Sequence, residues 1–259
     1  LDLDLYTSVL DWNTIRDLQL AFFKAQVPSL DTVQDHAFFA SLYNFAIKKK
    51  YKFILTGANF STESIREPIE WHYHASDLRQ IKDIHKMYGK NNLDLFPKCS
   101  IFKYKIFYKY FLGQNVFSPL NYIEYDKEEA LKLLINEIDY KKYEHKHYES
   151  RFTKFYEGYW LREKYGFDKR RAHYSSLILT DQMSRAEALQ KIHSSPYTKN
   201  ELNNEFEYIA TKLGIDIEEL TKLRNGKNKT YRDYKSSMTL IHIGTLIMKY
   251  LNIETRNLR

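Results

Sequence analysis

The sequence has little cysteine and no long hydrophobic run. Its 259 residues include one cysteine, Cys99, so neither a disulfide framework nor a four-thiolate zinc site can form. A single thiol fits a reducing compartment, and we expect a cytoplasmic protein. No apolar run approaches the roughly 20 residues of a transmembrane helix, and no signal peptide is recognisable, so we expect no membrane partner.

What the chain does contain is enough apolar material for a core. Hydrophobic residues make up 43% and aromatic residues 16%, with 22 Tyr against 16 Phe, which predicts many half-buried rings with a solvated hydroxyl. The net charge of +7 favours anionic ligands such as phosphates, but it does not by itself indicate nucleic acid.

The first half of the chain reads as an α/β layer. Alternation over Leu1–Thr7 predicts a strand, and Asp11 and Asp31 each precede a helical pattern. A second strand is predicted over Tyr51–Thr56 and a short one over Val116–Leu120. Strands alternating with helices favour a parallel sheet. The opening Leu1, already inside a strand pattern, indicates a chain cut from something longer.

The second half is predicted to be helical, and we place the division near residue 142. Residues 1–142 then form the α/β part and residues 143–259 the helical part. Capping patterns predict helix starts at Asp126, Ser150, Asp168, Ser184 and Asp216. A final amphipathic helix is predicted over Met238–Leu251, whose Ile241, Leu246 and Ile247 we expect to pack on the body.

The most informative stretch is the loop Gly57–Glu63. It follows the predicted strand Tyr51–Thr56, and open parallel sheets bind ligands beyond the carboxyl ends of their strands. In a functional interpretation, Gly57 lets a nucleotide approach the backbone while Asn59 and Glu63 contact it. The alternative is an ordinary strand-to-helix turn with capping side chains.

A second stretch, Asp168–His173, places Lys169, Arg170 and Arg171 in the first turn of a helix. Cations there oppose the helix dipole, at a cost of roughly 0.3–1 kcal/mol each. They make sense if a phosphate lies opposite, because helix N-termini attract anions and Arg fits phosphate oxygens. The alternative is pairing with carboxylates such as Glu163 and Asp168.

Other candidate residues have simpler interpretations. Phe152, Phe155, Tyr156 and Tyr159 follow helical spacing and predict a core stripe, with Arg151 and Lys154 near its edge, where they could reach a ligand. His72 and His74 lack a third convergent ligand, so we expect no metal site from them. Cys99 has no obvious base beside it and is interpreted as an inert thiol.

Several longer stretches together resemble one enzyme family. They are Gln34–Ala37, Thr56–Ser64, Ala75–Gln80, Pro119–Tyr122, His147–Lys154, Phe167–Ser176 and Lys229–Tyr234. The chain resembles, over nearly its whole length, the N-acetyl sugar amidotransferases of the O-antigen, pseudaminic acid and legionaminic acid pathways. These enzymes are similar to PP-loop ATP pyrophosphatases, so the resemblance implies an α/β fold with a parallel sheet of the adenine-nucleotide α-hydrolase type and a helical C-terminal region.

The resemblance also implies a reaction. ATP, with Mg²⁺, would adenylate the amide oxygen of a nucleotide-linked N-acetyl sugar, ammonia would attack the activated carbon, and AMP would leave. Because no glutaminase nucleophile is visible, a separate glutaminase subunit would supply the ammonia. This chemistry belongs to lipopolysaccharide O-antigen or related surface-sugar biosynthesis in the bacterial cytoplasm.

The resemblance assigns roles residue by residue. Lys154, Arg170 and Arg171 would be catalytic, stabilising charge on the pyrophosphate. Gly57, Asn59, Glu63, Arg151 and Lys169 would bind the nucleotide. Asp35, His36, Asp77 and Arg79 would bind the sugar substrate. On these assignments we expect Arg170→Ala to abolish ATP-dependent AMP formation while the protein stays folded.

The sequence departs from the family pattern in two places. The Ser-Gly-Gly-Lys-Asp-Ser loop that follows the first strand in the family is missing, and the 8 glycines offer no substitute, so we expect a portion lacking that strand and inactive alone. Asp181-Gln182-Met183 replaces a Gly-Gln-Met turn. Two alternatives stay open: a PP-loop enzyme that modifies tRNA, and a non-catalytic nucleic-acid-binding module, since Asp168–Ile192 loosely resembles a helix-turn-helix. Strong salt-dependent nucleic-acid binding would favour either.

Overall fold

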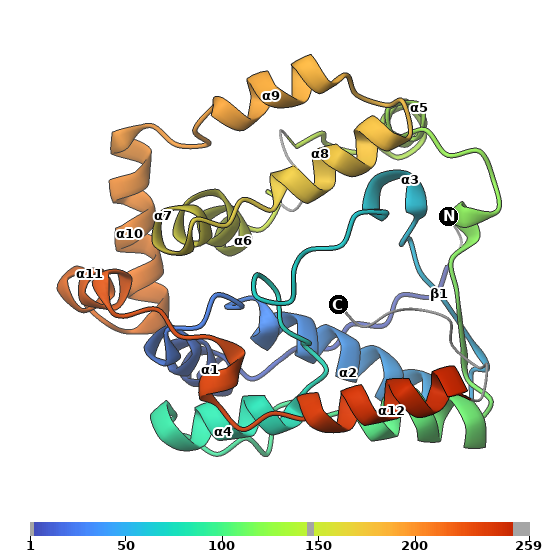
Figure 1. The fold of residues 1–259 in the computed structure, drawn as a ribbon, viewed down its shortest axis with the longest axis horizontal. Helices are drawn as coiled ribbons and strands as arrows, with labels where there is room; N and C mark the ends of the chain where they lie inside the picture. The colour runs from blue at the N-terminus through green and yellow to red at the C-terminus, as the bar shows by residue number, and fades with distance from the viewer. Residues whose placement is uncertain (1–2, 144–147, 251–259) are drawn as a thin grey trace.

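The computed structural model describes residues 3–143 and 148–250 and is dominated by helices (Figure 1). The first part contains α1 (Trp12–Ala25), α2 (Thr32–Lys48), β1 (Phe53–Leu55), α3 (Phe60–Glu63), α4 (Leu78–Tyr88), the π-helical η1 (Lys103–Phe111), β2 (Asn115–Phe117), the 3-10 turn η2 (Pro119–Asn121) and α5 (Lys127–Ile138).

In the described residues 148–250 the regular elements are all helices. They are α6 (Arg151–Phe155), the π-helical η3 (Tyr156–Trp160), α7 (Leu161–Tyr165), α8 (Arg170–Leu179), α9 (Arg185–His193), α10 (Lys199–Leu213), α11 (Ile217–Asn225), the 3-10 turn η4 (Tyr231–Asp233) and α12 (Met238–Tyr250). None of the helices in the described ranges is long and apolar enough to cross a membrane.

The two strands pair in parallel, with Ile54 opposite Val116. The predicted strands at Tyr51–Thr56 and Val116–Leu120 are therefore confirmed in part, each as three residues. In the first strand Phe53 and Leu55 are 67% and 69% exposed, whereas Ile54 is buried. Side chains alternate across a strand, so one face of β1 packs on the protein and the other does not.

The predicted strand at Leu1–Thr7 is wrong over its described residues. Residues 3–11 have no regular structure, and Leu3 and Leu5 are almost fully exposed, while Leu1 and Asp2 lie outside the described residues. Alternating Leu and Asp gives a strand only where another strand accepts its backbone hydrogen bonds, and the described chain brings none to this segment.

Most predicted helix starts are confirmed by their caps. The side chains of Asp11, Asp126, Ser150, Ser184 and Asp216 each accept the backbone N–H three residues on. Asp168 and Asp31 are the exceptions. Asp168 lies one residue before Lys169, the N-cap of α8, and Asp31 stands at the start of α2 but makes no side-chain cap bond. The Asp31 carboxylate is used elsewhere, as described below.

The stripe predicted over Phe152–Tyr159 is confirmed as core. The helices α6, η3 and α7 follow without a break, and Phe155 and Tyr156 are fully buried. They belong to one hydrophobic cluster that also takes Leu18 and Phe22 from α1 and Ile209 from α10. This cluster draws on both sides of residue 142, and the division into two parts at that residue stays a prediction.

The prediction that α12 packs on the body through Leu246 and Ile247 is wrong among the described residues. No α12 residue is buried, and these two side chains are 54% and 53% exposed; Leu251 lies outside the described residues. Figure 1 shows α12 along the lower edge of the molecule, with α8 and α9 on the opposite side and α3 between them.

Candidate functional site

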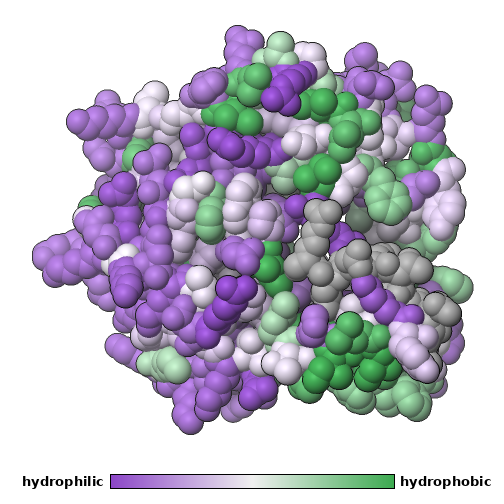
Figure 2. Space-filling model, viewed as in Figure 1, coloured by the Kyte–Doolittle hydropathy of each residue, from purple (hydrophilic) through white to green (hydrophobic). Residues whose placement is uncertain are grey.

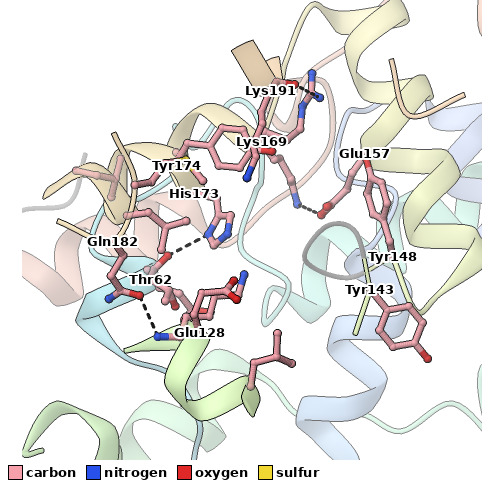
Figure 3. Close-up of a pocket in the computed structure, with 18 of the residues that line it drawn as sticks. Thr62, Glu128, Tyr143, Tyr148, Glu157, Lys169, His173, Tyr174, Gln182 and Lys191 are labelled. Carbon is pink, nitrogen blue, oxygen red and sulfur yellow. Dashed lines mark hydrogen bonds and ion pairs between the residues drawn. The ribbon is translucent and has the colours of Figure 1, made fainter. Parts of the chain in front are cut away.

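A cavity of about 720 Å³ lies beyond the carboxyl end of β1 (Figure 3). Its walls come from α3, the start of α5, the segments on either side of residues 144–147, η3, α8 and α9. Such a volume suits a small organic ligand. The position agrees with the expectation that the loop after this strand faces a binding site.

The short helix α3 and the helix α8 form one continuous wall of this cavity. His173 Nδ1 lies 3.2 Å from the Thr62 carbonyl oxygen, and the Thr180 hydroxyl donates to the Ser61 carbonyl at 2.8 Å. The Ile65 N–H donates to the Ser176 hydroxyl. Two stretches that carry the family resemblance, Thr56–Ser64 and Phe167–Ser176, are therefore joined directly.

Within the loop, capping explains Asn59, whereas Glu63 lines the cavity. The Asn59 side chain accepts the Thr62 N–H at 2.9 Å, and its amide donates to the Gly57 carbonyl. Asn59 is buried and does not line the cavity, whereas Glu63 is exposed and does. Gly57 is exposed outside the lining, and a Cβ added there would meet nothing within 4 Å. The capping alternative thus accounts for Asn59, and its nucleotide role stays a prediction.

A buried charge network stands at one side of the cavity, centred on Lys169. Its ammonium lies 2.9 Å from Asp31, 3.1 Å from Glu157 and 3.5 Å from Glu67. Burial disfavours the charged Lys169, but Asp31 and the other anions outweigh it and raise its pKa well above the ordinary value. Lys169 is therefore a fixed cation whose charge is neutralised inside the protein, as the alternative of carboxylate pairing foresaw, although its partners are different ones.

Asp31 and His72 complete the network from the other side. Burial opposes ionisation of Asp31, yet Lys169 and His72 outweigh it and lower its pKa. The His72 Nδ1 lies 3.5 Å from Asp31, and that carboxylate raises the pKa of His72 against the effect of burial. This is why Asp31 does not cap α2: its oxygens are committed to two cations.

Asp35, one turn further along α2, differs from Asp31 in that its pKa is raised. Burial, followed by the repulsion of Asp31, raises its pKa to about 7. No hydrogen bond or ion pair to its carboxyl exists within the described ranges. Potential ligand atoms of Asp31, Asp35 and His72 lie within 4.8 Å of one another. Because Lys169 already neutralises Asp31, a metal ion would have to displace an ammonium, and the donor set does not favour one.

Arg170 lines the cavity, but its guanidinium is fully occupied. Its Nε and Nη2 donate to Asp168 at 3.0 and 2.8 Å, and Nη1 and Nη2 donate to the carbonyls of Lys191, Ile192 and Ser194. These bonds use its five N–H donors. The guanidinium joins the start of α8 to the end of α9, so the phosphate role predicted for Arg170 is not supported by this arrangement.

The remaining cations of the predicted set do not line the cavity, although Lys154 lies over the ring of Tyr148, which does. Arg171 is exposed and outside the lining. Arg151 binds Glu205 at 2.9 Å and stacks on Tyr208, with its carbon Cζ 3.7 Å from the ring centre. Lys154 lies over the ring of Tyr197. The structure does not bring Arg151, Lys154 and Arg171 together with Glu63, and their ligand roles stay predictions.

The predicted substrate residues also have internal partners. His36 is fully buried; its Nδ1 bonds the Ala75 carbonyl at 2.7 Å and its Nε2 accepts the Cys99 N–H, while burial lowers its pKa. Asp77 is buried and caps α4 while accepting from Tyr73 and Ser237. Arg79 is exposed. Thus His36 and Asp77 hold the fold around the site instead of facing the cavity.

Sequence reasoning overlooked Gln182 as a residue of the site. Its amide oxygen accepts the Lys127 N–H at 3.1 Å and its amide nitrogen donates to the Tyr125 carbonyl, so it fixes the start of α5 against the cavity (Figure 3). The preceding Asp181 adopts a φ of 55°. A left-handed backbone favours glycine, which explains why the resembled family has Gly-Gln-Met where this chain has Asp181-Gln182-Met183. This turn was the sequence feature from which a role for Gln182 could have been predicted.

The charges around the cavity nearly balance. The carboxylates in the lining are Glu63, Glu67, Glu128, Glu149, Glu157 and Glu187, and the fully cationic side chains are Lys127, Lys142, Lys169, Arg170 and Lys191. Tyrosines add aromatic surface; Figure 3 shows Tyr143 and Tyr148 on one side of the opening, opposite His173 and Gln182. This mixture of carboxylates, amide and rings is suited to hydroxyl groups and sugar faces more than to a triphosphate.

Comparison with known proteins adds one finding. Residues 149–249 match the family model described as LPS biosynthesis protein WbpG-like, C-terminal domain. This part of the chain is similar to that domain. The match includes η3, α8 and α9, three of the cavity's walls, and supports a role in lipopolysaccharide biosynthesis. Neither the curated proteins nor the solved structures contain a match to the chain.

Proposed function

We propose that this protein acts in lipopolysaccharide biosynthesis as an N-acetyl sugar amidotransferase, and that the cavity holds the nucleotide-linked sugar. One observation carries the proposal. The loop after β1 and the helices similar to the WbpG-like domain enclose the same cavity, and the cavity's lining suits a sugar. The proposal converts an acetamido group to an acetamidino group, as the family resemblance implies.

The lining residues have distinct tasks in this proposal. The half-exposed ring of Tyr143 and the ring of Tyr148 offer apolar faces to the sugar's C–H groups. Glu63 and Glu128 line the cavity, and they would accept hydrogen bonds from hydroxyl groups, with Glu128 turning from its exposed ion pair with Lys142 at 3.1 Å.

The residues present do not fit a triphosphate. Lys169 and Arg170 are committed to internal partners, the cavity charges nearly balance, and the described chain holds no glycine-rich loop. We therefore derive no step through ATP from this geometry. ATP and Mg²⁺ remain part of the proposed reaction, with their phosphate-binding groups outside this cavity.

The source of ammonia is proposed to be a separate glutaminase subunit. A glutaminase of the thiol type needs an accessible, activated cysteine. Cys99 is buried, and burial raises the pKa of its thiol. The single thiol of this chain therefore does not provide that nucleophile.

The direct test is an assay of the full-length enzyme, in which the strand missing from the family pattern is supplied, with ATP, Mg²⁺, ammonium chloride and a panel of nucleotide-linked N-acetyl sugars such as UDP-N-acetylglucosamine. We expect AMP and an acetamidino sugar in equal amounts, detected by mass spectrometry. If no sugar in the panel yields AMP and the protein instead binds tRNA with strong salt dependence, the amidotransferase proposal fails in favour of a nucleic-acid function.

Gly57 offers a sharper test of the nucleotide's place. Since a Cβ there would meet nothing within 4 Å, Gly57→Ala should leave the melting temperature unchanged. If a nucleotide packs on this backbone, as the resemblance implies, the added methyl should weaken ATP binding about tenfold or more. Gly244→Ala, another open glycine remote in sequence, is the matched control. Equal ATP affinity in both variants would remove Gly57 from the nucleotide site.

A further inference from the structure

Two helical segments, η1 and α12, each expose several large apolar side chains. η1 exposes Phe102, Ile106, Phe107, Tyr110 and Phe111, and α12 exposes Leu240, Ile243, Leu246, Ile247 and Tyr250; we call these the η1–α12 surface. Figure 2 shows a hydrophobic patch at the lower right, where Figure 1 places α12. Clustered exposed apolar residues mark interaction sites.

The charge of both segments has one sign. Residues 95–123 contain no Asp or Glu and carry Lys98, Lys103, Lys105 and Lys109. Residues 234–250 likewise contain no acid and carry Lys235 and Lys249. The chain has 33 acidic residues, yet these two stretches have none and expose apolar side chains. Together they form a surface that is both cationic and hydrophobic.

The two segments meet at the turn His74–Asp77. Burial and, next, the charge of Lys105 on η1 lower the pKa of His74. Asp77 accepts both the N–H and the hydroxyl of Ser237, at 2.6 and 2.8 Å, immediately before α12 begins. This turn therefore holds the start of α12, and Lys105 lies near it.

We propose that the η1–α12 surface binds the surface of an anionic membrane. Phe, Leu and Ile side chains would enter the boundary between headgroups and acyl chains, while the lysines reach lipid phosphates with their long stems. This revises the expectation that no membrane takes part, and it concerns a surface contact, not a span. It is independent of the proposed amidation.

The chemistry favours this occupant over two others. Nucleic acid could contact the lysines and the aromatic rings of this surface. The aliphatic side chains of Leu240, Ile243 and Leu246, however, can neither stack on bases nor form hydrogen bonds with them. A second copy of this chain would bring its own lysines against Lys103, Lys105 and Lys109 with no carboxylate between them. Anionic lipid is complementary to both the charge and the aliphatic groups.

Vesicle co-sedimentation tests the proposal. We expect binding to vesicles of phosphatidylglycerol and phosphatidylcholine, weaker at high salt, and none to phosphatidylcholine alone. The pair Lys103→Gln and Lys109→Gln should weaken binding roughly 20-fold, because each lysine near an anionic surface contributes about fivefold. The matched pair Lys199→Gln and Lys222→Gln removes the same charge from α10 and α11, which Figure 1 places away from α12, and should change binding less than about twofold.

A second variant tests the apolar contribution. Leu246→Ser with Ile247→Ser should abolish vesicle binding while the circular dichroism and the melting temperature stay as in the wild type, since both side chains are already exposed. The proposal is overturned if the wild type binds neither vesicle, or if it binds both equally. Equal losses of binding in the two lysine pairs would also overturn it. So would a wild-type protein that binds no vesicles but is a dimer in sedimentation velocity, if the serine variant is a monomer.

Discussion

The part of the molecule built around α1, α4, α6 and α10 differs from the part built around α2, β1, η1 and α12. In the first, the large side chains are buried and the charged groups at its border pair with one another. In the second, a small cluster around Tyr43, Ile54 and Tyr108 leaves most neighbouring apolar side chains exposed. The first part therefore stabilises the fold, while the second leaves apolar surface exposed to solvent.

The largest effect expected from this contrast is at Lys169. Replacing it with Met leaves Asp31, Glu157 and Glu67 without their shared cation, and removing one partner of a buried ion pair costs about 3–5 kcal/mol. Urea unfolding followed by circular dichroism measures the change. Lys191→Met, at a half-exposed pair with Glu187, should stay within about 0.5 kcal/mol. Similar losses in the two variants would mean that the network around Lys169 does not stabilise the fold.

Arg170 comes next, and here the structure reverses the expectation from the sequence. Arg170→Ala should destabilise the protein by about 2–4 kcal/mol, because Asp168 and three carbonyls of α9 and its end lose their donor. The neighbouring exposed Arg171→Ala should cost less than about 0.5 kcal/mol. A folded Arg170→Ala variant with unchanged stability and lost AMP formation would restore the phosphate role.

Asp35 should give a pH-dependent effect of intermediate size. Its folded pKa, about 7, lies above the value of an unfolded aspartate, so the folded state holds the proton more tightly. That contribution to stability is complete at low pH and is lost as the pH rises through about 7. Asp35→Asn should therefore gain about 1–3 kcal/mol over the wild type between pH ~4 and pH ~8. The exposed Asp94→Asn is the control, and a gain that does not vary with pH would contradict the account.

The smallest effect compares two neighbours on β1. Ile54 is 7% exposed and Leu55 is 69% exposed. Ile54→Val should cost about 1 kcal/mol in the free energy of unfolding, whereas Leu55→Val should change it by less than about 0.5 kcal/mol. Equal costs would show that the outer face of β1 is covered in solution, and the contrast between the two parts would lose its clearest example.

How far the sequence predicted the fold depended on how local each feature is. Caps at Asp11, Asp126 and Asp216 and the stripe at Phe155 and Tyr156 follow from neighbouring residues, and they are confirmed. The strand at Leu1–Thr7 failed because a strand needs a partner that the local pattern cannot supply.

The site was predicted in position but not in detail. The loop after β1 does reach a cavity shared with the helix after Asp168. The pairing of Arg170 with Asp168, offered as the alternative from the sequence, is confirmed. The bonds from Arg170 to the carbonyls of Lys191, Ile192 and Ser194 were not predicted, because these residues lie some 20 positions further along the chain. Gln182 was missed because Tyr125 and Lys127, which it contacts, lie 57 and 55 residues away in the sequence.

The central claim is that the cavity between α3, α5 and α8 binds a nucleotide-linked N-acetyl sugar. Saturation-transfer NMR with UDP-N-acetylglucosamine tests it most directly. The account predicts contacts to the acetamido methyl group in the wild type and in Glu137→Gln, an exposed residue of α5 outside the cavity, and their marked loss in Glu128→Gln, whose side chain lines it. Equal signals from Glu128→Gln and Glu137→Gln, or no saturation transfer in the wild type, would contradict it.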